Sequence, residues 1–199
     1  MMRPAADRWY ALLSLLAVAS LAIALHGHRR ALAGYQARAE RIGPQLVRLE
    51  MIDRLIGVRL PDLPLTDPAG GHRSLAAAGR ARIVWFVQVD ECAGCLEASL
   101  KEWHALLTRS PLDGVVVLSG VDRRRGARIA RRAGVRSAVL LDTASGAATA
   151  LGLRAPSVTV VSDAGGLIVL ADARFSGAAR GGCGPGFLDR VAAIYGPGG

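Results

Sequence analysis

The chain has 199 residues, of which 51% are hydrophobic, and a formal net charge of +9. This length and apolar content allow one ordinary domain with a real core and an appendage. Although 24 of the 25 basic residues are arginine, only nine aromatic residues accompany them without any alternation that would form a stacking platform, so we expect no nucleic-acid partner.

The first predicted element is a membrane segment. Residues 9–25 contain no charged side chain and are bounded by Arg8 on one side and by Arg29 and Arg30 beyond the other end. Seventeen residues are at the short end of what a membrane-spanning helix needs. We predict residues 1–28 to be an uncleaved N-terminal anchor. A cleaved signal peptide stays an alternative, because Ala-x-Ala sites lie within the run.

Residues 29–56 predict a helical stalk. Their apolar residues recur at spacings of three and four, which is typical of an amphipathic helix or a short coiled coil. Packing on the same chain and homodimerisation therefore both stay open. Gly43 and Pro44 predict a kink or a division of this helix. Residues 57–82 are rich in proline and glycine and predict loops.

From residue 83 onward the pattern predicts alternating strands and helices. Strands are expected over 83–89, 114–119, 138–141, 157–161 and 167–171, and helices over 93–107, 122–133, 146–151 and 187–195. This order of β-α-β-α-β followed by a hairpin predicts an α/β domain over 57–199, with a central mixed sheet and helices on both faces.

Cys92-Ala93-Gly94-Cys95 lies at the first predicted turn from strand to helix. Unpaired backbone N–H groups and the helix dipole favour a thiolate at this place, and the thiolate is the nucleophile of thiol–disulfide exchange. We therefore predict Cys92 and Cys95 to be catalytic. Zinc would need two more ligands, and Cys183 is the only other cysteine, so we expect no metal. Buried inert thiols are the plain structural alternative.

With these residues in this order, residues 57–195 resemble the thioredoxin superfamily, and most of all its membrane-anchored TlpA-type redoxin branch. The likeness is carried by the dithiol, by the opening segment 57–67, by an extra strand–helix unit over 114–141 and by the segment that begins Ala155-Pro156. The resemblance implies a thioredoxin-like fold and thiol–disulfide oxidoreductase activity, and we expect no cofactor.

The resemblance also assigns residues around the dithiol. It implies that Pro156 is a cis-proline that shapes the site and that Ala155 lines the bound substrate chain. A trans-proline that starts a strand is the alternative. The remaining residues expected to line the substrate are Glu91, Ala93 and Gly94.

The chain departs from the family pattern next to the dithiol. Asp90 and Glu91 stand where the family usually has tryptophan before the first cysteine, and a carboxylate beside a thiol disfavours the thiolate. Phe86 stands where many thioredoxins carry a buried acid. These departures keep open a second function, a scaffold subunit of a membrane complex with a structural or vestigial disulfide. Val89 stands where peroxiredoxins carry threonine, which argues against a peroxidase.

Cys183 lies in a glycine-rich loop before the last predicted helix. It is either a third thiol that exchanges with Cys92 or with a partner, or a free thiol without a role in exchange.

The location of the domain is predicted from two opposing arguments. The basic residues that follow the membrane segment, Arg29 and Arg30 among them, would retain the domain in the cytoplasm by the positive-inside rule. Membrane-tethered dithiols, however, usually serve substrates outside the cytoplasm. We give the chemistry more weight and predict a single-pass protein of the cell membrane. Its domain would face the extracytoplasmic space and act on protein thiols and disulfides there.

Overall fold

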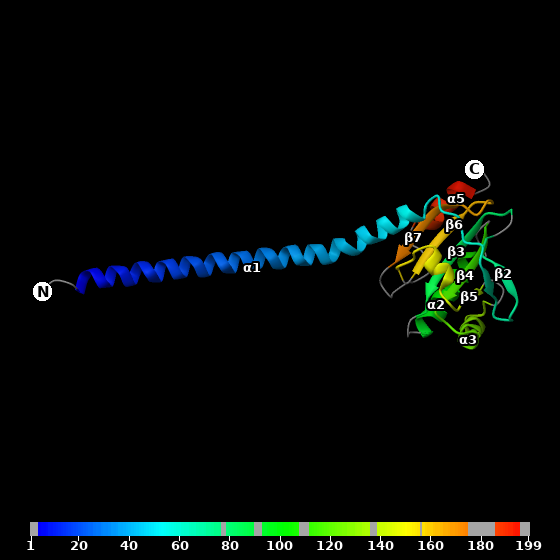
Figure 1. Ribbon diagram of the computed structural model, residues 1–199, viewed down its shortest axis with the longest axis horizontal. Helices are drawn as coiled ribbons and strands as arrows, with labels where there is room; N and C mark the ends of the chain where they lie inside the picture. The colour runs from blue at the N-terminus through cyan, green and yellow to red at the C-terminus, as the bar shows by residue number, and fades with distance from the viewer. Residues whose placement is uncertain are drawn as a thin grey trace. The chain divides into compact units, whose positions relative to one another are not determined.

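The computed structural model describes residues 4–76, 79–89, 93–107, 112–135, 139–155, 157–174 and 186–195 (Figure 1). The chain forms two compact units, which divide between Leu46 and Val47. Helix α1 (Pro4–Leu55) belongs to both units, since its last nine residues are part of the second one. The domain boundaries expected after residues 28 and 56 stay predictions.

Helix α1 covers both the predicted membrane segment and the predicted stalk. It continues through Gly43 and Pro44, where the sequence predicts a kink or a division, so the predicted division of the helix there is wrong, whereas the kink stays a prediction. A proline inside a helix removes one backbone hydrogen bond, and here the helix continues past it. Within the part of the chain that the structure describes, no helix is both long and apolar enough to cross a membrane. The structure thus has a helix over residues 9–25 and gives no support to the predicted span.

The second unit contains one seven-stranded mixed sheet in the order β2-β1-β5-β4-β3-β6-β7. The three central strands β3, β4 and β5 are parallel, and the other neighbouring strands are antiparallel. This confirms the predicted mixed sheet. The strands are β1 (Pro64–Thr66), β2 (His72–Ser74), β3 (Arg82–Gln88), β4 (Asp113–Ser119), β5 (Val139–Asp142), β6 (Ser157–Ser162) and β7 (Ile168–Arg174).

Strands β1 and β2 form a hairpin in a region that the sequence predicts to be loops. Each strand has only three residues, and Leu65 is the single side chain of the two strands that is buried. A pattern of alternation needs more residues than this to be recognised. The hairpin is instead stabilised at its turn, where a carboxylate oxygen of Asp67 accepts from the backbone N–H groups of Gly70 and Gly71, both at 2.8 Å.

Four helices accompany the sheet, all within about one residue of their predicted positions. Asp122 caps the start of α3 by accepting from the backbone N–H of Arg125 at 2.7 Å, and Gly134 ends that helix with a φ of 73°. The helices are α2 (Ala93–Leu107), α3 (Arg123–Ala133), α4 (Gly146–Ala150) and α5 (Phe187–Tyr195).

Apolar side chains form a core on each face of the sheet. Helices α2, α3 and α5 cover one face, where their side chains pack on Ile83, Trp85 and the neighbouring strands. The other core contains Val84 and Phe86 of β3 together with α4 and two side chains of α1, Met51 and Leu55. Helices therefore lie on both faces, as predicted. Successive residues of β3 are buried on opposite faces of the sheet, because β3 lies in its interior between β4 and β6.

Candidate functional site

The dithiol segment joins the carboxyl end of the interior strand β3 to a helix. Strand β3 ends at Gln88, and α2 begins at Ala93, so Gly94 and Cys95 belong to its first turn. This is the strand-to-helix junction that the sequence predicts. Cys92 and Glu91 lie outside the described residues, and the side chain of Cys95 is not described either. The roles predicted for these side chains therefore stay predictions.

The antiparallel pairing of β3 with β6 brings the segment of Ala155 to the same place. Val87 pairs with Ser157, which is the first residue of β6. The residues that precede Ser157 therefore lie opposite those that follow Val87, at the end of β3 where the dithiol segment begins. Ala155 is buried there, with 7% of its surface exposed. Pro156 lies outside the described residues, so its cis geometry stays a prediction.

A hydrogen bond and an aromatic contact hold these elements together. The indole Nε1 of Trp85 donates to the hydroxyl of Ser157 at 2.8 Å inside the core. The ring of Trp85 also packs on that of Trp103 of α2, with the ring centroids 5.2 Å apart and the planes at 47°. Both tryptophans are almost fully buried, so these contacts connect β3, β6 and the dithiol-bearing helix into one frame around the junction.

Polar side chains line up along the edge of the sheet where the parallel strands end. Gln88 pairs in register with Ser119, and Ser119 pairs with Asp142, so the last residues of β3, β4 and β5 are neighbours. Asp142 is buried, and its carboxylate accepts from three backbone N–H groups at the start of α4 at 2.8, 3.0 and 3.2 Å. The hydroxyl of Ser119 donates to the same carboxylate at 3.4 Å.

A cleft of about 230 Å³ opens beside this edge. Sequence reasoning did not find it, because its lining comes from four separate segments. Gln88 and Ser119 could have been singled out as the last residues of two parallel strands, since ligands in α/β sheets bind at that end. The cleft is lined by Phe86, Val87, Gln88, Ser119, Ser145, Ala148, Thr149, Leu153 and Ala155, so it combines an apolar floor with hydroxyl and amide groups.

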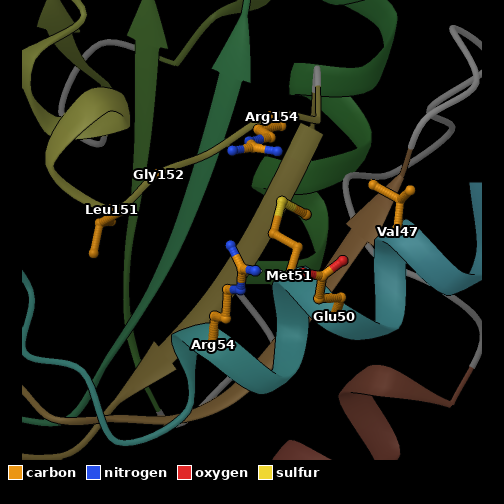
Figure 2. Close-up of a pocket in the computed structure, with 7 residues that line it drawn as sticks. All are labelled: Val47, Glu50, Met51, Arg54, Leu151, Gly152 and Arg154. Atoms are coloured by element: carbon orange, nitrogen blue, oxygen red, sulfur yellow. Dashed lines mark hydrogen bonds and ion pairs between the residues drawn. The ribbon is translucent and has the colours of Figure 1, made fainter.

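A second pocket, of about 130 Å³, lies between the last turns of α1 and the segment after α4 (Figure 2). Its lining residues are Val47, Glu50, Met51, Arg54, Leu151, Gly152 and Arg154. The two charged side chains that α1 contributes to the pocket, Glu50 and Arg54, form an ion pair with one another. The pocket contains none of the predicted site residues.

One charged group near the start of α2 is paired with the neighbouring helix. Glu97 of α2 accepts from a guanidinium nitrogen of Arg132 of α3 at 3.4 Å. Phe86 is 3% exposed in the strand that leads to the dithiol, so an apolar side chain occupies the position where thioredoxins often bury an acid.

Among the described residues no three histidine, cysteine or acidic side chains lie close enough to hold a metal ion. Cys183 lies outside the described residues.

Comparison with known proteins finds likeness at the level of structure alone. No family model matches the chain. No curated protein matches it either. A candidate thiol:disulfide interchange protein DsbE from Chlorobium tepidum is 14% identical, with a TM-score of 0.56 over 70% of this chain and 96% of that one. A secreted disulfide oxidoreductase from Mycobacterium tuberculosis, described as homologous to E. coli DsbE, is 15% identical, with a TM-score of 0.53 over 71% and 98%.

The same fold also occurs in a protein with other chemistry. Reduced Prx3 from Vibrio vulnificus, solved in complex with hydrogen peroxide, is 17% identical to this chain, with a TM-score of 0.55 over 70% of this chain and 97% of that one. At these identities the likeness shows the fold and leaves the activity to the residues of the site.

The second unit therefore has a thioredoxin-like fold. Its architecture resembles that of solved structures described as DsbE or as thiol–disulfide oxidoreductases.

Proposed function

We propose that this protein is a membrane-tethered thiol–disulfide oxidoreductase that acts through Cys92 and Cys95 on protein disulfides outside the cytoplasm. One observation carries the proposal. The Cys-Ala-Gly-Cys segment joins β3 to α2 in a thioredoxin-like sheet, and the register of β6 brings Ala155 to the same end of β3. Two segments far apart in the sequence, which the family resemblance assigns to one site, thus lie together.

The proposed reaction exchanges disulfides in two steps. The thiolate of Cys92 attacks one sulfur of the substrate disulfide, forms a mixed disulfide and releases the other substrate sulfur as a thiolate. The thiolate of Cys95 then attacks the sulfur of Cys92, which closes the Cys92–Cys95 disulfide and releases the second substrate thiol. Two electrons pass from the protein dithiol to the substrate. The reverse sequence oxidises a substrate dithiol.

The activity is tested with the full-length chain in a Cys183→Ser background, so that only the dithiol reacts. Reduction of insulin and of several peptide disulfides is followed with a chemical reductant that regenerates the protein. The parent protein should accelerate reduction, and Cys92→Ser should return the rate to that of the reductant alone. Equal inactivity of the parent and of Cys92→Ser toward every disulfide would reject the proposal.

A scaffold function is favoured by one specific observation, the buried Phe86 where a proton-accepting acid is common in thioredoxins. A redox titration separates the two functions. A disulfide that stays closed at roughly −300 mV or lower is resistant to the cellular thiol pools, as structural disulfides are. The oxidoreductase proposal expects a higher potential than this.

Attachment to a membrane through residues 9–25 is the second part of the proposal. Large apolar side chains of this segment are exposed, among them Leu15 at 73% and Ile23 at 74%. An exposed apolar surface of this kind marks a site of contact with a membrane or with another protein. The test introduces Arg80→Cys, at a position with 78% of its side chain exposed, into a chain whose own cysteines are replaced by serine. A membrane-impermeant maleimide should label this protein in intact spheroplasts. Labelling only after lysis would place the domain in the cytoplasm, and recovery of the protein without membranes would reject the tether.

A further inference from the structure

Helix α3 presents an exposed row of arginines that its own fold does not require. Arg124, Arg128 and Arg131 follow one another at i, i+4 and i+7, so they lie on one side of the helix, and all three side chains are exposed. We call these three residues the basic stripe. The opposite side of the helix is buried through Gly126, Ile129, Ala130 and Ala133.

The other arginines of α3 have partners within the protein. Arg123 donates to the backbone carbonyl of Ala69 at 2.8 Å, and Arg132 pairs with Glu97. Among the described residues, by contrast, no carboxylate forms an ion pair with a member of the basic stripe. Three like charges therefore face solvent together.

The placement of two of these charges opposes the stability of the helix. Arg124 belongs to the first turn of α3, where the helix dipole disfavours a cation, and no acidic residue occurs in that turn. Arg124 and Arg128 are a like-charged i,i+4 pair, and such pairs destabilise helices. Only Arg131, in the last turn, is favoured by the dipole. The stability of the helix therefore does not explain Arg124 and Arg128, which points to a partner of opposite charge.

The position of the stripe indicates what the partner is. The Arg132–Glu97 ion pair places the last turn of α3 against α2 about one turn after the start of α2, and Glu97 is two residues after Cys95. Helices α2 and α3 lie side by side (Figure 1), and side chains of both belong to one hydrophobic core. A protein that presents a disulfide to the start of α2 therefore comes close to the stripe.

We propose that the basic stripe is a docking surface for partner proteins that carry carboxylates around their reactive disulfide or dithiol. That the partner carries a reactive disulfide or dithiol is an inference that rests on the proposed function. That the partner is negatively charged is inferred from the structure of α3. Complementary charge of this kind acts mainly on the rate of association and on the choice of partner.

The test uses three synthetic disulfide peptides that differ only in the residues that flank the disulfide, which are aspartate, asparagine or lysine. We compare the full-length chain with a stripe variant that combines Arg124→Gln, Arg128→Gln and Arg131→Gln. The control combines Arg30→Gln, Arg38→Gln and Arg80→Gln, which removes the same charge from exposed positions elsewhere.

At low salt, the parent and the control should reduce the aspartate peptide roughly tenfold faster than the lysine peptide, which is within the usual range of electrostatic steering. The difference should shrink as salt shortens the range of the interaction. The stripe variant should reduce the two peptides at rates within about twofold of one another. An unchanged preference in the stripe variant would overturn the proposal.

Binding of a fluorescent aspartate peptide without cysteine separates this inference from the proposed function. If no disulfide is reduced but the stripe variant alone loses binding, the oxidoreductase proposal fails and the docking surface stands. Equal binding by all three proteins overturns the docking surface whatever the activity. If the stripe variant keeps its peptide preference but loses a preference of the parent for anionic phosphatidylglycerol over neutral phosphatidylcholine vesicles, the stripe serves a membrane and the proposal is wrong.

Thermal unfolding tests whether the three arginines of the basic stripe serve only to stabilise the fold. The stripe variant should melt at the same temperature as the parent or at a higher one, because like-charge repulsion is removed. A lower melting temperature would show that these arginines stabilise the fold, and it would overturn the argument for a partner.

Discussion

Trp85 and Ser157 connect the strand that precedes the dithiol to the strand that follows Ala155. We expect Ser157→Ala to destabilise the protein by about 1–3 kcal/mol, because the buried indole N–H of Trp85 is then left without its acceptor. Urea unfolding measures the loss. Trp85→Phe combined with Ser157→Ala should be less destabilised than the sum of the two single variants, since both hydrogen-bonding groups are then removed together. Full additivity would contradict this explanation.

Asp67 makes the β1–β2 hairpin sensitive to acid. The backbone N–H of Gly71 is the main cause that holds the pKa of this carboxyl below its ordinary value of 3.8. Because the folded pKa is the lower one, the carboxylate contributes stability above pH 3.8 and this contribution is lost as the pH falls through the folded pKa. Asp67→Asn should therefore flatten the acid side of a stability–pH curve. An identical curve for the variant and the parent would exclude this contribution.

Arg48 and Arg54 lie on the same helix and form ion pairs of different kinds. Arg48 pairs with Asp172, whose side chain is 2% exposed, whereas Arg54 and Glu50 are both exposed. Arg48→Ala should cost about 2 kcal/mol of unfolding free energy, because it removes the cation from a buried carboxylate. Arg54→Ala is the matched control and should change stability by less than about 1 kcal/mol. Equal effects in chemical denaturation would show that burial of Asp172 is not the deciding factor.

At the scale of whole elements, the last nine residues of α1 belong to the folded unit. Met51 is 7% exposed and Leu55 is 1% exposed, and both belong to the core that contains Val84 and Phe86 of β3. A fragment that begins at residue 57, which is where the sequence places the start of the domain, lacks both side chains. It should be less stable than a fragment of residues 47–199 by about 3–6 kcal/mol, at 1.5–3 kcal/mol for each buried side chain. Equal unfolding midpoints for the two fragments would refute this assignment.

The elements that the sequence predicts well are those with a strong local signal. Strand β3 is a continuous apolar run and α3 has capping residues at both ends, so both could be placed within a residue. The hairpin of β1 and β2 has one buried side chain and carries no such pattern. The course of α1 through Pro44 was not predictable from local preference, which favours a break there.

The candidate site was also predictable only in part, because some of its features have a local sequence signal and others depend on which strands are neighbours. The spacing of Cys92 and Cys95 and their place before an apolar helix are local, so the junction could be located. The carboxylate of Asp142 and the cleft beside it depend on which strands are neighbours, because Ser119 and Asp142 are brought together by the pairing of β4 with β5. A single sequence does not contain that register.

At the scale of the whole molecule, three features lie at the carboxyl end of β3. They are the dithiol segment, the buried Ala155 and the cleft that Gln88 helps to line. The frame of Trp85, Trp103 and Ser157 holds the surrounding strands and α2 in place. Such a frame suits a reaction in which a partner must reach one sulfur in a defined orientation.

Trapping of the mixed disulfide tests the central claim most directly. The full-length chain with Cys95→Ser and Cys183→Ser is incubated with a peptide disulfide, and the intact mass of the protein is measured. We predict a covalent adduct of one peptide chain on Cys92, because the thiol that would resolve it is absent. The matched chain with Cys92→Ser and Cys183→Ser should form no such adduct at the same rate. Equal adduct formation by the two variants, or none by either, would contradict the assignment of Cys92 as the attacking thiol.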